Sequence, residues 1–294
     1  MIWSPFTGNL SDNLKSYLIT RIVADKKGYE FGFNRHPEFD YYGGQPQLDF
    51  FDIDYGSEHS YKYADVPEFV TNIWDEKRTS TQKIGNDNVD FYDYQPDIFD
   101  IPDNTKIIVK CLQDIRYYQD YKDKIQSWIN VKEEIQYETI KILFDNDIIL
   151  NDDVCICSIR GGEFRSVPNL ILAKKYWEDA KNKMIEHNPN MRFYLVSEDP
   201  QYSASLFDNQ FPVIHISPAA DWFILNSAKN LILSNSGFGI FPTWLNKNNP
   251  YTIAPWGWAR YNIGMWCPAS LWLYPWNFMN RDGEFKKVEE ENES

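Results

Sequence analysis

The chain has 294 residues, 43% hydrophobic and 17% aromatic, which is enough for one large domain or two ordinary domains with a substantial core. Its formal net charge is −14, and the sequence holds no basic patch of the kind that binds DNA or RNA. The 11 tryptophans favour a carbohydrate ligand, because aromatic rings are a common platform for sugars.

The N-terminal stretch MIWSPFTGNLSDN lacks the charged and apolar regions of a signal peptide, and no apolar run approaches the roughly 18 residues of a membrane span. We therefore expect a cytoplasmic protein without a membrane span. The four histidines form no metal motif, and no zinc-ligand spacing is found among the four cysteines, Cys111, Cys155, Cys157 and Cys267. We interpret the cysteines as small buried side chains in a reducing compartment.

Residues 1–148 are predicted to form a first, Rossmann-like domain. Apolar residues recur at helical spacing from Leu10 to Ile22, so we expect a helix that ends near Lys27, and then a strand over 29–33. Residues 36–104 are rich in Asp, Tyr, Pro and Gly, and we interpret them as a loop-rich excursion. A strand over 105–112 and a helix over 115–136 follow.

Residues 149–283 are predicted to form a second domain with a regular alternation of strands and helices. Strands are expected over 154–159, 192–197, 211–216, 230–235 and 251–256, with helices over 167–186, 217–228 and 238–246. In the helix over 217–228, Ser217 is the cap and Pro218 the first residue. This alternation indicates a parallel, doubly wound sheet. The acidic tail over 284–294 is expected to be disordered.

Three strands of the second domain end in polar loops of small residues: SIRGGEF (158–164), VSEDPQ (196–201) and SNSGFG (234–239). Ligands of doubly wound sheets bind at the carboxyl ends of the strands. Arg160 supplies a cation there, and residues 236–238 begin a helix, where free backbone N–H groups favour an anion. These loops predict a phosphate site, although glycines also occur at such turns where no ligand binds.

The succession of these segments resembles the α-1,2-fucosyltransferase family, within a superfamily that includes the α-1,6- and protein O-fucosyltransferases. The family pattern H-x-R-R-G-D-Y is similar to SIRGGEF, F-S-D-D to VSEDP, D-l-x-l-M-s-x-C to ADWFILNSAKN, and I-I-x-N-S-S-F-S-W-W to LILSNSGFGIF. The N-terminal G-G-L-G-N-Q-L is similar to GNLSDNL. The resemblance covers nearly the whole chain in order, but Ser158 replaces the motif histidine and Gly161 the second arginine.

The resemblance implies an α/β, GT-B-like fold with two Rossmann-like domains facing a central cleft, the first on the acceptor side and the second for the nucleotide sugar. It also implies an inverting, metal-independent glycosyltransferase without a cofactor, which moves fucose from GDP-fucose to a glycan hydroxyl. Two alternatives stay open. One is the same fold with another nucleotide sugar, and the other is a catalytically silent glycan-binding module.

Three residues are candidates for catalysis. Arg160 aligns with the phosphate-binding arginine of the family, and fixed donors must stabilise a leaving diphosphate where no metal does so. Its alternative is a surface or interdomain salt bridge. Glu163 and Asp12 are alternative bases for the acceptor hydroxyl, and a mechanism without a base is also open.

The predicted donor site follows the same motifs. Asp221 is a candidate for guanine recognition, because one carboxylate can accept hydrogen bonds from both N1–H and the 2-amino group. Its alternative is an ordinary acid in the first turn of a helix. Asp199 either lines the donor pocket or caps a turn, and Gln113 is an acceptor-side candidate. The full donor-binding set is Arg160, Gly161, Gly162, Ser197, Asp221, Asn235, Ser236, Gly237 and Phe238, and the N-terminal loop contributes Gly8, Asn9 and Asn13.

Overall fold

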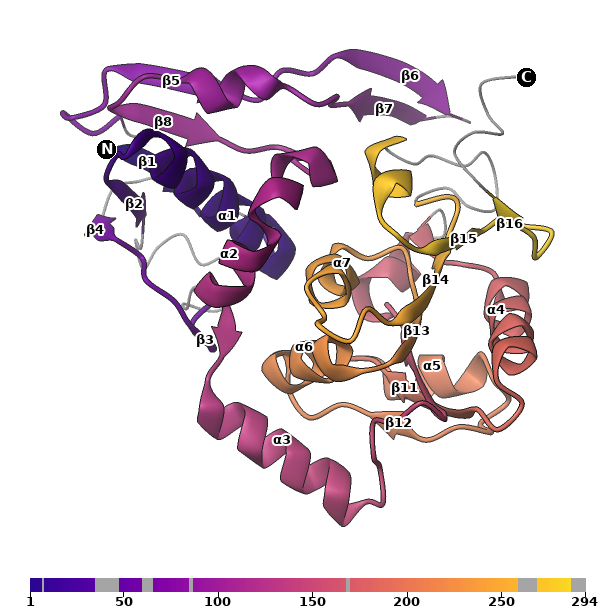
Figure 1. The fold of residues 1–294 in the computed structure, drawn as a ribbon. Helices are drawn as coiled ribbons and strands as arrows, with labels where there is room; N and C mark the ends of the chain where they lie inside the picture. The colour runs from indigo at the N-terminus through magenta and orange to yellow at the C-terminus, as the bar shows by residue number, and fades with distance from the viewer. Residues whose placement is uncertain are drawn as a thin grey trace. The chain divides into compact units, whose positions relative to one another are not determined.

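The fold is that of a computed structural model (Figure 1), which describes residues 1–6, 8–34, 48–59, 66–84, 87–167, 170–258 and 269–286. The chain divides into two compact units. The first holds Met1–Gln82 and Asn88–Lys132, and the second holds Lys83–Asp87 and Glu133–Ser294. The domain boundary expected at residue 148 lies inside the second unit, because helix α3 (Glu133–Asp145) packs against α6 (Pro218–Ser227).

The first unit is built on a five-stranded parallel sheet in the order β4-β2-β1-β8-β5. Its strands are β1 (Ile2–Pro5), β2 (Phe31–Asn34), β4 (Ser57–His59), β5 (Asn72–Asp75) and β8 (Thr105–Ile108). Helix α1 (Leu10–Lys27) joins β1 to β2, as the periodicity predicts, and is buried on most sides. A capping box of Asn9 and Asp12 begins α1, and Gly28 ends it with a left-handed φ of 71°.

Two expectations for this unit are corrected by the structure. The stretch 36–104 is not only loops, since β4 and β5 belong to the main sheet, while β6 (Ser80–Ile84) and β7 (Asp87–Phe91) form a two-stranded sheet. The helix expected over 115–136 is interrupted. In its place the chain forms η3 (Ile115–Tyr117), η4 (Gln119–Tyr121), α2 (Lys122–Trp128) and β9 (Asn130–Val131). A further 3₁₀ turn, η2 (Pro96–Asp100), lies before β8. The helix breaks because β9 pairs with a distant strand, β3 (Phe51–Asp52).

The second unit contains a seven-stranded sheet in the order β12-β11-β10-β13-β14-β15-β16. Its strands are β10 (Val154–Ser158), β11 (Arg192–Val196), β12 (Val213–Ile214), β13 (Asn230–Leu233), β14 (Tyr251–Pro255), β15 (Asn277–Met279) and β16 (Phe285–Lys286). All neighbouring strands are parallel except β15 and β16. Helices α4 (Lys174–His187) and α5 (Pro200–Ser205) lie on one face, and α6 and α7 (Gly237–Trp244) on the other (Figure 1). Short 3₁₀ turns are η5 (Gly162–Ser166) and η7 (Ala269–Leu273).

The core of the second unit confirms that two of the cysteines are buried. Cys155 and Cys157 are fully buried free thiols, and they pack with Trp177 and Met184 of α4. Cys111, in the first unit, is a free cysteine that is only partly buried, so the expectation of a buried side chain is not met there. Cys267 lies outside the described residues.

Two local expectations for the second unit are wrong. The helix predicted from residue 167 begins at Lys174, since residues 167 and 170–173 are not α-helical; residues 168–169 lie outside the described ranges. The C-terminal segment expected to be disordered begins with β16 at 285–286, because its backbone pairs with β15. The rest of that tail, 287–294, is outside the described residues.

Candidate functional site

The three predicted loops of the second unit meet at one edge of its sheet. Strands β11, β10 and β13 are adjacent and parallel, so their carboxyl ends lie side by side. From β10 the chain proceeds outward through β11 and β12, and it then returns to β13 on the other side of β10. The direction of winding therefore reverses between β10 and β13, and such a switch point is where open α/β sheets bind ligands.

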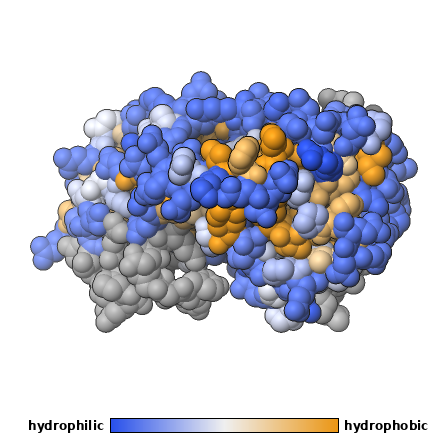
Figure 2. All heavy atoms as spheres, turned by 90° about the horizontal axis from the view of Figure 1, so that it is seen from below, coloured by the Kyte–Doolittle hydropathy of each residue, from blue (hydrophilic) through white to orange (hydrophobic). Residues whose placement is uncertain are grey.

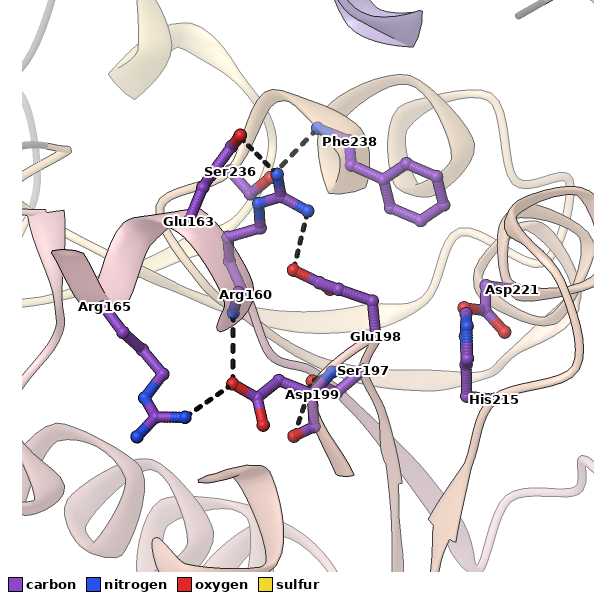
Figure 3. Close-up of polar contacts among 11 residues, drawn as sticks. Arg160, Glu163, Arg165, Ser197, Glu198, Asp199, His215, Asp221, Ser236 and Phe238 are labelled. Atoms are coloured by element: carbon purple, nitrogen blue, oxygen red, sulfur yellow. Dashed lines mark hydrogen bonds and ion pairs between the residues drawn. The ribbon is translucent and has the colours of Figure 1, made fainter. Parts of the chain in front are cut away.

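Arg160, just after β10, is held by two carboxylates (Figure 3). Its Nη1 donates to Glu198 Oε1 at 2.7 Å, and its Nη2 donates to Glu163 Oε1 at 2.6 Å. The guanidinium carbon also lies 5.2 Å from the centroid of the Phe164 ring. All three charged side chains are partly exposed, so the ion pairs are accessible to a competing anion.

Next to this group, Asp199 organises the loops after β10 and β11. Its Oδ2 accepts from the Gly162 N–H at 3.2 Å and from Arg165 Nη1 at 3.1 Å, while its Oδ1 caps α5 by accepting from Tyr202 N–H at 3.2 Å. Burial raises the pKa of Asp199, but the hydrogen bonds and the Arg165 charge together bring it below its ordinary value. Ser197 Oγ accepts from the Asp199 N–H at 3.1 Å. Ser197 and Asp199 therefore hold the loop itself.

The two glycines after Arg160 have steric reasons to lack a side chain. A Cβ on Gly161 would lie 2.6 Å from the Asp199 Cβ. Gly162 has a φ of 47°, in the left-handed region that other residues rarely adopt, and its missing Cβ would meet Glu198 Oε1 at 3.1 Å. The bare backbone that the sequence shows here lets the loops after β10 and β11 approach each other closely.

The loop after β13 begins helix α7. Ser236 is the N-cap residue, and its Oγ accepts from the Phe238 N–H at 3.3 Å. Figure 3 shows Ser236 and Phe238 at the start of this helix. The loop that leads into it lies next to the end of β10, because the Ser234 N–H donates to the Ser158 carbonyl at 2.9 Å. Gly237 is the first residue of α7. Asn235 is buried, and its side-chain amide donates to the backbone carbonyls of Leu170 and Trp258, so it supports the loop from inside.

Asp221 lies in the first turn of α6, as predicted, and it has a partner that the sequence analysis did not single out. His215 Nδ1 lies 2.7 Å from Asp221 Oδ2, and the Ile216 N–H approaches Oδ1 at 3.5 Å. Asp221 is only 4% exposed, and burial raises its pKa even though His215 acts to lower it. The sequence held one signal for His215. It directly follows the short strand β12, so it lies at the carboxyl ends of the strands, where ligands of such sheets bind.

The residues of the N-terminal loop gather at the start of α1 in the first unit. Gly8 has a φ of 74°, and a Cβ there would lie 2.5 Å from Asp12 Oδ2. Asp12 Oδ1 pairs with Lys15 Nζ at 2.8 Å, and Lys15, which sequence reasoning missed, is only 3% exposed. Asn13 is also buried. Its side-chain oxygen has no hydrogen-bond partner among the described residues, and the same is true of Gln113 Oε1.

Within the described ranges, no group of three or more His, Cys, Asp or Glu side chains is placed to hold a metal ion. Nor does any helix in those ranges have the length and apolar character needed to cross a bilayer.

No protein-family model matches the sequence, and no curated protein matches it. Solved structures resemble the fold. The fucosyltransferase NodZ from Bradyrhizobium aligns with a TM-score of 0.50 at 12% identity, covering 83% of this chain and 91% of that one. NodZ α-1,6-fucosyltransferase co-crystallised with GDP gives a TM-score of 0.48 at 12% identity, covering 85% and 95%. POFUT1 in complex with GDP-fucose gives 0.47 at 10% identity, covering 84% and 93%.

The similarity at a TM-score of 0.50 confirms the predicted fold class, a GT-B-like α/β fold with parallel sheets. The solved structure in that comparison is a fucosyltransferase. The central cleft and the roles of the individual site residues stay predictions.

Proposed function

We propose that the chain is an inverting, metal-independent glycosyltransferase that moves fucose from GDP-fucose to a glycan hydroxyl. The observation that carries this proposal is the position of Arg160, which directly follows β10 at the switch point of the second sheet, where the neighbouring strand β13 leads into the start of α7. Cleavage of a sugar–phosphate bond builds negative charge on the leaving diphosphate. A planar guanidinium and the backbone N–H groups of a helix start are suited to stabilise that charge. The motif resemblance and the fold support the choice of GDP-fucose.

Binding of the diphosphate requires an exchange of partners at Arg160. Nη1 and Nη2 are engaged by Glu198 and Glu163, so phosphate oxygens that bind these two nitrogens would replace the carboxylates. The exchange would release Glu163 as a free carboxylate next to the bound donor, where it could accept the proton of the acceptor hydroxyl. Asp12 is the alternative base, although in the free protein it is engaged by Lys15 and by the cap of α1.

Asp221 and His215 form the proposed base-recognition pair. A buried carboxylate can accept from the N1–H and 2-amino groups of guanine, which distinguishes guanine from the other bases. His215 holds Oδ2 of this carboxylate, so it orients Asp221 before the nucleotide arrives. Because the carboxylate is already oriented, nucleotide binding costs less conformational entropy of this side chain.

The test is release of GDP from GDP-fucose by the purified chain, with and without a glycan acceptor, followed by linkage analysis of the product. Arg160→Ala is expected to lower turnover by about 10²–10³-fold, the typical cost of losing one transition-state donor. Arg165→Ala is the matched control, because Arg165 is a nearby arginine that serves Asp199 instead. Turnover of Arg160→Ala within a few-fold of the wild type would refute the assignment. A thermal-shift measurement tests the nucleotide itself. If UDP raised the melting temperature of the chain and GDP did not, the donor would be a different nucleotide sugar.

One observation favours a second candidate, a glycan-binding module without catalysis. Arg160 is already neutralised by two acids, and the second arginine of the family motif is Gly161. A protein of this kind would bind glycans and release no GDP in the same assay, whatever the acceptor.

A further inference from the structure

Helix α3 exposes a row of large apolar side chains that the proposed reaction does not use. Tyr137 and Phe144 are each 70% exposed, and Ile140 between them is 55% exposed. The spacings of three and four residues place all three on one face of the helix. Ile149, 60% exposed, follows the helix, and the view in Figure 2 shows an apolar patch on this side of the molecule. We call Tyr137, Ile140, Phe144 and Ile149 the α3 face.

The α3 face is large enough to act as a contact surface. Fully buried aromatic side chains cover about 150–250 Å² each, so Tyr137 and Phe144 alone expose roughly 200–350 Å². With the two isoleucines, the face reaches the size at which an exposed apolar patch marks an interaction site. The other side of α3 is already occupied, because Thr139 and Leu143 are buried where the helix packs against α6.

The charges beside the α3 face indicate what kind of partner fits. Glu133, Glu134 and Glu138 are exposed on α3, and none of them makes an ion pair in the part of the chain that the structure describes. The one lysine of the helix, Lys141, is paired with Asp145 at 2.6 Å. The apolar row is therefore bordered by uncompensated negative charge. A second copy of the chain would bring the same acids together, and like charges in close contact are unfavourable.

We propose that the α3 face is the docking surface for a basic amphipathic helix of a partner protein. Such a helix would lay apolar side chains along Tyr137, Ile140 and Phe144, while its lysines or arginines meet the free glutamates. This surface is separate from the loops around Arg160, since none of its residues belongs to them.

The probe is a fluorescent leucine–lysine peptide of about 18 residues, with leucines at helical spacing, titrated against the full chain. Two reference peptides are needed: one with glutamate in place of lysine, and one with the same composition but without amphipathic spacing. We expect the leucine–lysine peptide to bind best, and its affinity to fall as salt is added.

Three double variants locate the binding. Ile140→Ser with Phe144→Ser is expected to weaken binding at least about tenfold, because it removes the centre of the apolar row. Glu134→Gln with Glu138→Gln leaves the apolar row intact and is expected to weaken binding several-fold and reduce its salt dependence. Ile185→Ser with Leu273→Ser is the matched control for exposed apolar residues elsewhere, and it is expected to bind like the wild type.

Each remaining outcome overturns the proposal. These are unchanged binding in the α3-face variant, equal binding of the glutamate peptide, or equal binding of the peptide without amphipathic spacing. A chain that sediments as a dimer, and becomes a monomer only in the α3-face variant, would show that a second copy occupies the surface.

Discussion

Replacing Glu198 by glutamine is expected to tighten the binding of GDP, which is the opposite of what removing a ligand-binding residue would do. In the structure, Glu198 Oε1 takes one of the two N–H edges of Arg160 at 2.7 Å, on the guanidinium that the diphosphate is proposed to use. A diphosphate therefore has to break this ion pair and then lie close to the carboxylate that it displaced. Glutamine keeps the shape of the side chain and removes the charge.

The magnitude follows from the exposure of the two groups. A partly exposed ion pair is worth about 0.2–1 kcal/mol. The repulsion between the displaced carboxylate and a phosphate charge about 4 Å away is about 1 kcal/mol in water and about 4 kcal/mol at an effective dielectric constant of 20. Because Glu198 is partly exposed and can turn into solvent, we take the lower end of this range. The sum is about 1–2 kcal/mol, which corresponds to roughly five- to thirtyfold tighter binding.

Calorimetric titration of GDP into Glu198→Gln and the wild type, at low and high salt, measures this difference. Glu178→Gln is a suitable control, since Glu178 is an exposed acid that pairs with Lys174 on α4. GDP affinity that is unchanged in Glu198→Gln would show that the diphosphate does not replace Glu198 on Arg160. Weaker binding would show that Glu198 itself holds part of the nucleotide, and either result refutes the reasoning.

Further predictions follow from the same region. Gly161→Ala should lower the free energy of unfolding by about 1–3 kcal/mol in urea titrations, because the new Cβ would overlap Asp199. Gly239→Ala inside α7 is the control and should be neutral or stabilising, because the nearest atom to its new Cβ is 3.5 Å away. Equal effects of the two substitutions would contradict the steric argument. Asp221→Asn should weaken GDP binding about ten- to hundredfold. Because burial raises the pKa of Asp221 and guanine needs the ionised form, wild-type affinity should fall as the pH drops through that raised pKa, and calorimetry across pH should show this dependence disappear in Asp221→Asn. Turnover is expected to survive EDTA; loss of activity that Mg²⁺ or Mn²⁺ restores would refute metal independence.

The placement of the candidate site was predictable because it depends on local patterns. Arg160, Glu163 and the residues 236–238 follow strands that the apolar runs already indicate, and parallel neighbours bring their carboxyl ends together. What each side chain does there was not predictable. The pairing of Arg160 with Glu198, and of His215 with Asp221, joins residues from different strand ends. Such contacts depend on rotamers and on distances that no spacing in one segment encodes.

Periodicity and capping act within a few residues, and they are enough to indicate the α/β class, the helix from Leu10 to Lys27 and the alternating order of the second half. The break in the helix that forms β9, and the membership of β4 and β5 in the first sheet, depend on the folded chain, since strand pairing is a contact between distant segments. The tertiary structure also explains why position 161 is a glycine. The neighbour that excludes a Cβ there is Asp199, which follows a different strand, and the two meet only because β10 and β11 pair in register.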